Sequence, residues 1–119
     1  MATKYIEVDT SFSTADTEPG ISLVYIDRKL TLTFSSWRSE PTVVVFYDVP
    51  AFRWDESWSS YTDIAPERVY RVEESEWLER WKREVLVSDS ESYVHFRLGF
   101  NAEGMFLDII ASRMEHKNA

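Results

Sequence analysis

Two segments near the end of the chain, residues 93–100 and 105–112, constrain the fold more than any other part of the sequence. Both alternate between apolar and other side chains, and four residues ending in Gly104 separate them, which is typical of a β-hairpin. If Phe100 lies opposite Met105, three further apolar pairs face each other: Leu98 with Leu107, Phe96 with Ile109, and Val94 with Ala111. A shift of one residue would turn this whole set to the other face of the sheet. The sequence therefore predicts both the hairpin and its register.

The same register gathers polar side chains on the other face of the hairpin. It places Arg97 opposite Asp108 and makes His95 a diagonal neighbour of Asp108. It also sets Phe106 against Gly99, where the ring can cover bare backbone. We expect a solvated polar stripe, in which the Arg97–Asp108 ion pair contributes little to stability. The alternative is a catalytic set, in which a Ser or Tyr from another strand joins His95 and Asp108.

Shorter strands are expected earlier in the chain. Residues 42–48 contain a continuous apolar run, which favours a central strand covered on both faces. Asp27-Arg28 is expected to form a hairpin turn between two other strands. The full set of expected early strands is 4–8, 21–26, 29–37, 42–48, 51–54 and 68–72.

No strand–helix–strand alternation is visible, so neighbouring strands are expected to be mainly antiparallel. The sequence predicts an α+β fold, with a strongly bent sheet of six to eight short strands and one amphipathic helix. A length of 119 residues is typical of a single domain, 1–119, and we expect frayed ends at 1–3 and 113–119.

One segment, about 75–86, has the pattern of an amphipathic helix. Ser75 is a suitable N-cap because its hydroxyl can accept a hydrogen bond from a backbone N–H of the first turn. Glu76 and Arg80 are spaced to form an i,i+4 ion pair on the solvent side. The apolar stripe that should face the sheet consists of Trp77, Leu78, Trp81 and Val85.

Composition argues against several kinds of site. The chain has no Cys and only two histidines, His95 and His116, so we expect no metal site. The three glycines are too widely separated to form a Gly-rich phosphate loop, and no cofactor is expected. The formal net charge of −8 disfavours binding to the phosphates of nucleic acids.

The location of the protein is also constrained by composition. No run approaches about 18 apolar residues, so no membrane-spanning helix is expected. The first ten residues lack the basic region and apolar block of a secretory signal. Because the absence of Cys fits a reducing compartment, we expect a cytoplasmic protein.

The segment 48–76 combines acidic and aromatic residues. It holds eight acidic residues and three arginines, and therefore carries −5 of the net charge of −8. Tyr and Trp are enriched among the residues that dominate protein interfaces, and nearby carboxylates attract basic partners. The alternative is that Trp54 and Trp58 hold a long loop on the core. The residues expected to bind a partner are Phe52, Trp54, Asp55, Glu56, Trp58, Tyr61 and Asp63.

In size, charge and its acidic-aromatic segment Phe52-Arg53-Trp54-Asp55-Glu56-Ser57-Trp58, the chain resembles small immunity proteins of bacterial toxin systems. Those proteins are commonly acidic, single-domain and cytoplasmic, and neutralise a toxin by tight contact. The resemblance implies a bacterial, non-enzymatic domain that binds a protein with a basic face. It assigns no functional residue.

Two other functions stay open from the sequence. One is a small-ligand carrier or accessory subunit with an apolar pocket, lined by Tyr25, Phe34, Phe46 and Trp81. The other is a hydrolase-like enzyme that uses His95 and Asp108. The protein is expected to be a monomer, or a homodimer formed through an exposed sheet edge.

Overall fold

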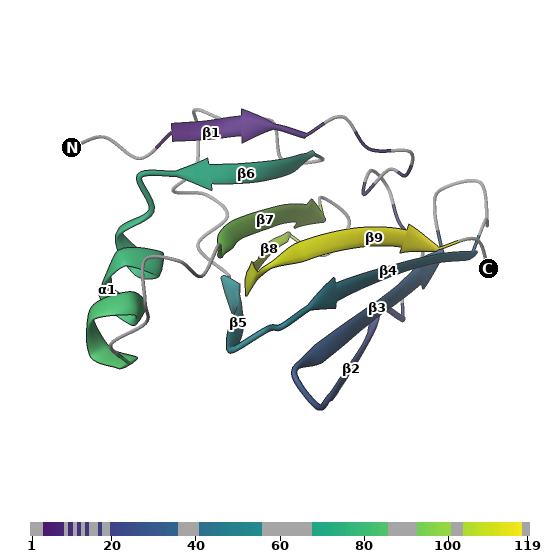
Figure 1. Cartoon of the computed structure of the whole chain (residues 1–119). Helices are drawn as coiled ribbons and strands as arrows, with labels where there is room; N and C mark the ends of the chain where they lie inside the picture. Colours follow the sequence, from purple (N-terminus) through teal and green to yellow (C-terminus); the bar gives the residue numbers. More distant parts are fainter. Residues whose placement is uncertain are drawn as a thin grey trace.

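The computed structural model describes residues 4–8, 10, 12, 14, 17, 20–35, 41–55, 68–85, 93–100 and 104–117. Within these residues the chain forms nine strands and one helix (Figure 1). The elements are β1 (Lys4–Glu7), β2 (Ser22–Ile26), β3 (Lys29–Ser35), β4 (Pro41–Tyr47), β5 (Ala51–Asp55), β6 (Val69–Glu73), α1 (Glu76–Val85), β7 (Val94–Phe100), β8 (Met105–Ala111) and β9 (Arg113–Lys117). The antiparallel α+β class is confirmed, while the strand count exceeds the expected six to eight.

The strands form two open sheets in place of the single bent sheet that we expected. The five-stranded sheet has the order β1-β6-β7-β8-β5, and the four-stranded sheet has the order β2-β3-β4-β9. All pairings are antiparallel. Residues 48–50 join β4 to β5, and Ser112 joins β8 to β9. The paired strands β4 and β9 of one sheet are therefore continuous with the paired strands β5 and β8 of the other.

The end of the chain is more ordered than the sequence suggested. Residues 113–117 form β9, which pairs with β4, so the expected frayed tail is wrong for this segment. Met114 packs against the core, and Tyr47 donates a hydrogen bond from its hydroxyl to Glu115 at 3.2 Å. The strand was not predicted because four of its five residues are polar or charged, and Met114 is the one apolar side chain that packs against the core. The expected frayed ends at 1–3 and 118–119 lie outside the described residues.

Both hairpins that the sequence predicted are present. The β7–β8 register pairs Phe100 with Met105 and Arg97 with Asp108, and every other predicted pair is confirmed. In the β2–β3 hairpin, Asp27 and Arg28 form the two-residue turn with φ angles of 51° and 63°. Positive φ at both positions is the conformation of a type I′ turn, which matches the twist of the flanking strands.

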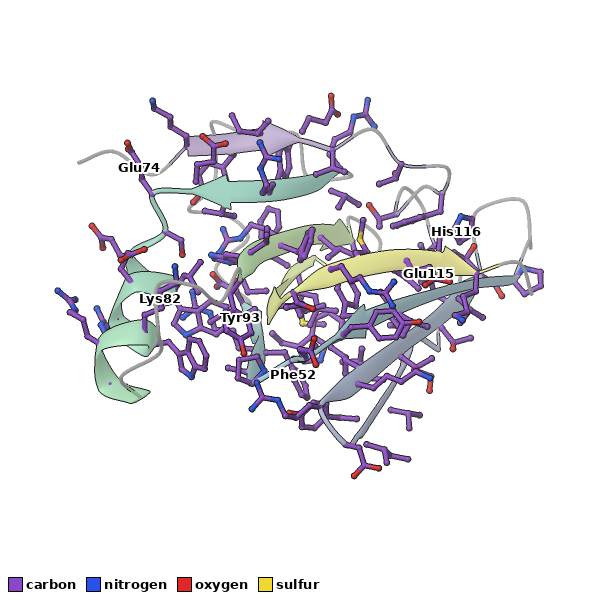
Figure 2. The ribbon with its side chains drawn as sticks, viewed as in Figure 1. Phe52, Glu74, Lys82, Tyr93, Glu115 and His116 are labelled. Carbon is purple, nitrogen blue, oxygen red and sulfur yellow. The ribbon has the colours of Figure 1, made fainter. Side chains whose placement is uncertain are left out.

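The hydrophobic core lies between the two sheets, where Figure 2 shows side chains filling the space. Alternate residues of the central strands supply it, as the period of two in a strand requires. Its buried members are Leu30, Leu32, Phe34, Val44, Phe46, Val49, Val69, Phe96, Leu98, Phe100, Leu107, Ile109 and Ala111. On β7 and β8 these core residues alternate with His95, Arg97 and Asp108, which therefore lie on the outer face of the five-stranded sheet.

Helix α1 begins as predicted. Ser75 caps it, because the backbone N–H of Leu78 donates to Ser75 Oγ at 3.1 Å. Trp77 and Leu78 turn toward the five-stranded sheet, and the Trp77 ring lies 5.0 Å from the ring of His95. The expected Glu76–Arg80 ion pair is not among the ion pairs of the described residues. No helix in the described part of the chain is long and apolar enough to cross a membrane.

Candidate functional site

The outer face of the five-stranded sheet carries a buried polar cluster, consisting of Ser75, His95, Arg97 and Asp108. The exposed fractions are 4% for His95, 2% for Arg97 and 0% for Asp108. The expected solvated stripe is therefore wrong. Trp77 of α1 packs against His95, and the guanidinium group of Arg97 lies over the rings of Tyr5 and Phe106. Buried charge is costly unless it is paired, so the partners of this cluster matter.

Asp108 is the centre of the polar cluster. Arg97 donates two parallel hydrogen bonds to its carboxylate, from Nε at 2.7 Å and from Nη2 at 2.8 Å. His95 Nε2 lies 2.7 Å from Asp108 Oδ1, and Arg53 Nε lies 3.4 Å from Oδ2. Burial by itself would raise the pKa of Asp108, but the hydrogen bonds from His95 and Arg97 outweigh it and lower the pKa to about 2. Asp108 is therefore ionised at neutral pH.

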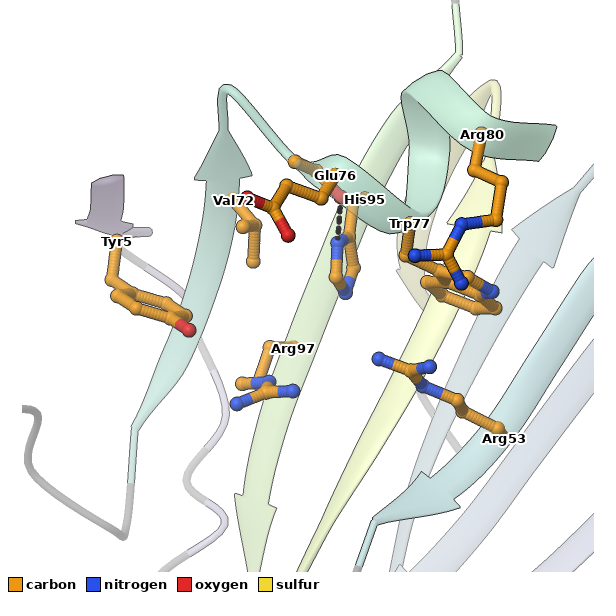
Figure 3. Close-up of a pocket in the computed structure, with 9 residues that line it drawn as sticks. Tyr5, Arg53, Val72, Glu76, Trp77, Arg80, His95 and Arg97 are labelled. Atoms are coloured by element: carbon orange, nitrogen blue, oxygen red, sulfur yellow. Dashed lines mark hydrogen bonds between the residues drawn. The ribbon is translucent and has the colours of Figure 1, made fainter. Parts of the chain in front are cut away.

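The state of His95 follows from its surroundings. Burial disfavours the charged imidazolium and lowers the pKa of His95, although Asp108 acts in the opposite direction. A neutral His95 must donate from Nε2, because ionised Asp108 can only accept. Its Nδ1 is then an acceptor, and the Ser75 hydroxyl donates to it over 2.7 Å (Figure 3). The result is a hydrogen-bonded chain, Ser75–His95–Asp108, that ties the start of α1 to β7 and β8.

Strand β5 adds an outer layer to the polar cluster. Its register places Arg53 beside Asp108 and Asp55 beside Phe106. Arg97 donates from Nη2 to Asp55 at 3.2 Å, so Asp55 is turned toward the cluster. The guanidinium carbon of Arg53 lies 4.3 Å from the centre of the Trp77 ring, within the range of a cation–π contact.

A pocket of about 210 Å³ opens next to the polar cluster (Figure 3). Its walls come from five elements, of which β7 supplies residues of the polar cluster and the other four supply Tyr5 on β1, Val72 on β6, Arg53 on β5, and Glu76, Trp77 and Arg80 on α1. Ser75, His95 and Arg97 also line it. Three guanidinium groups therefore surround this pocket, and one carboxylate, that of Glu76, faces them.

A second hollow of about 570 Å³, the acidic depression, lies at the start of α1. It is lined by Glu74, Ser75, Glu76, Glu79, Arg80 and Arg83. The two hollows share Ser75, Glu76 and Arg80, so the first turn of α1 separates a largely cationic pocket from a more acidic depression.

The described part of the expected partner-binding surface is divided between two faces. On β5, Phe52 and Trp54 lie opposite Ile109 and Leu107, on the side of the core. Phe52 packs against the core, while Trp54 stays 37% exposed. Asp55 lies on the opposite face, toward Arg97. The other expected contact residues, Glu56, Trp58, Tyr61 and Asp63, lie outside the described residues.

The two remaining hypotheses can be compared with the same geometry. Phe34 and Phe46 are buried core residues, and neither they nor Tyr25 and Trp81 line the two hollows described above. In the part of the chain that the structure describes, no group of three or more metal-ligating side chains occurs.

Sequence reasoning had anticipated that a Ser might join His95 and Asp108, but it did not identify Ser75, which it used only as a helix cap. Arg53 was not predicted as a site residue, because it lies beside Asp108 only through the pairing of β5 with β8, which the sequence does not indicate. Comparison of the chain with protein-family models, curated proteins and solved structures found no match.

Proposed function

We propose that this protein is a non-enzymatic domain that binds a protein partner with a basic face, as cytoplasmic immunity proteins do. The observation that carries the proposal is the structural role of Ser75. Its hydroxyl caps α1 and also bonds to His95, and the residue is 4% exposed. In a catalytic serine the hydrogen bond to histidine activates the hydroxyl, whereas the Ser75 oxygen is buried and also accepts the backbone N–H that caps α1. The geometry therefore favours a Ser75–His95–Asp108 chain that holds the helix to the sheet.

A binding role is supported by the distribution of negative charge. The protein has a net charge of −8. Four carboxylates gather at the start of α1: Glu73, the last residue of β6, and Glu74, Glu76 and Glu79, which line the acidic depression. All four are exposed, and Figure 2 shows Glu74 at the outer surface of the molecule. A field of one sign raises the rate of encounter with an oppositely charged protein.

The experiment is affinity capture of the partner followed by measurement of its dissociation constant. We expect a captured protein that is basic, with an affinity that falls as added salt screens the carboxylates. Glu79→Gln removes one carboxylate from the acidic depression and should weaken binding about threefold. Asp27→Asn removes the same charge from the β2–β3 turn and is the matched control, with little expected effect.

Two outcomes would contradict the proposal. An equal loss of affinity in both variants would show that only net charge matters, and that the acidic depression is not the contact surface. Covalent labelling of Ser75 by a fluorophosphonate, a reagent that modifies activated serines, would instead favour the hydrolase hypothesis.

A further inference from the structure

We propose that the 210 Å³ pocket is a binding site for a small molecule that carries a phosphate or carboxylate group. This site does not depend on the protein partner proposed above. The argument comes from two arginines, Arg53 and Arg80, which reach the pocket from different elements, β5 and α1. Figure 3 shows both side chains beside the ring of Trp77.

Two positive charges that converge repel each other unless an anion lies between them. Arg80 forms no ion pair with any described residue, because its expected partner Glu76 is turned toward Val72, as Figure 3 shows. Arg53 donates only its Nε, over a long 3.4 Å, to an Asp108 carboxylate that Arg97 and His95 already hold. Among the described residues, the outer nitrogens of both guanidinium groups are therefore left for a ligand.

The chemistry of the walls fits an oxyanion. Guanidinium groups bind phosphate and carboxylate through parallel hydrogen bonds, and this charge-assisted contact is about twice as strong as a neutral one. Arg53 is held over the Trp77 ring, which fixes its position before a ligand arrives. Tyr5 and Trp77 add aromatic surface on two sides of the pocket. Since a phosphate group fills only part of 210 Å³, the ligand has room for a small organic group beside the anion.

The test is an NMR titration of the isolated protein, followed through the indole N–H signal of Trp77. That signal is assigned by its loss in Trp77→Phe. The probes are inorganic phosphate, phenyl phosphate and benzoate, with benzyl alcohol as the uncharged control, all at constant ionic strength. We expect the charged probes to shift the signal in a saturable way, and the phosphate and benzoate arms to distinguish the two kinds of anion.

The decisive comparison uses two arginines of the same helix. Arg80→Gln should weaken binding about tenfold, because it removes one of the two converging guanidinium groups. Arg83→Gln makes the same change in charge, but Arg83 lines only the acidic depression. This variant should weaken binding less than about twofold. Both side chains are exposed, so both variants are expected to fold, which a thermal unfolding curve checks.

Three results would overturn the proposal: no saturable shift with any charged probe, equal weakening in Arg80→Gln and Arg83→Gln, or equal binding of benzyl alcohol. None of these depends on whether a protein partner is found, so failure of this site and failure of the proposed protein binding are separate observations.

Discussion

The two faces of the five-stranded sheet are both buried, but by different means. On the inner face, Phe96 and Leu98 of β7 and Leu107 of β8 pack in an apolar core. On the outer face, the intervening residues His95 and Arg97 are buried, and both form hydrogen bonds with Asp108. Apolar packing tolerates small changes of shape, whereas a buried ion pair needs each partner in place. The comparison shows that the same two strands stabilise the fold through two kinds of contact.

This difference matters for function because the outer face adjoins a hollow lined by described residues that a ligand can enter. The inner face is closed by the second sheet, while the outer face borders the pocket beside Trp77 and Arg80. The buried guanidinium group of Arg97 therefore belongs to a face whose polar groups line a pocket. The three predictions below test whether the two faces differ as this argument requires.

The largest effect is expected when one partner of the polar cluster is removed. Asp108 and Leu107 are neighbours on β8, both 0% exposed, and they face opposite sides of the sheet. Asp108→Ala leaves the buried Arg97 without its main counter-charge and should lower the free energy of unfolding by about 4 kcal/mol. Leu107→Ala removes apolar contacts and leaves a cavity, and should cost about 3 kcal/mol. Urea unfolding of both variants provides the measurement.

The losses of stability in Asp108→Ala and Leu107→Ala are similar in size but differ in cause, and a second substitution distinguishes them. Adding Arg97→Met to Asp108→Ala removes the unpaired guanidinium, so the double variant should recover a large part of the lost stability. No second substitution of this kind should rescue Leu107→Ala, because its loss comes from an empty volume. If Asp108→Ala costs less than about 1 kcal/mol, the polar cluster is not a structural element of the outer face.

A smaller loss is expected from Ser75→Ala. The variant removes the cap of α1 and leaves Nδ1 of His95 without its donor, which together should cost about 2 kcal/mol. Ser112→Ala is the matched control, because its hydroxyl also makes two hydrogen bonds but is only partly buried. We expect the control to change the free energy of unfolding by less than about 0.5 kcal/mol. Equal losses in a urea titration would mean that burial adds nothing to the Ser75 contacts.

Most of the strands and the helix could be predicted from the sequence because their signals are local. The apolar pairs from Phe96 with Ile109 to Phe100 with Met105 fix one register, and the structure has that register. The cap at Ser75 depends only on the residues next to it in the chain. In contrast, β9 was missed because its charged side chains lie beside β4, a strand that is far away in sequence.

The candidate site was predictable only in part, for a related reason. The pairing of Arg97 with Asp108 follows from the hairpin, but the groups around this pair come from other elements, with Tyr5 on β1 and Arg53 and Asp55 on β5. Arg53 on β5 and Arg80 on α1 line the same pocket, and no periodic pattern in the sequence indicates that these two elements lie together. Alternation along β5 also separates Asp55 from Trp54, which composition alone had grouped together.

The smallest effect concerns pH, and it should also distinguish the two faces. The pKa of His95 is lowered by burial, so as pH falls below the ordinary histidine value of about 6.5 the unfolded chain binds a proton before the folded one does. Stability should therefore be complete above that pH and decline below it. A second decline, of about 2 kcal/mol, belongs to Asp108 and should occur only as pH falls from about 4 toward its folded pKa of about 2. The two declines fall in separate windows of pH.

Urea unfolding at pH 7.5 and pH 5.5 isolates the first window. His95→Gln should be less stable than the wild type at pH 7.5, because a buried ring is lost, but its stability should change less between the two pH values. His116→Gln removes the only other histidine of the chain and is the matched control. Leu107→Ala alters the inner face and should keep the wild-type pH dependence, since it removes no titrating group. If His116→Gln abolishes the decline and His95→Gln does not, the pH sensitivity belongs to the four-stranded sheet, and the buried imidazole is not the group that titrates.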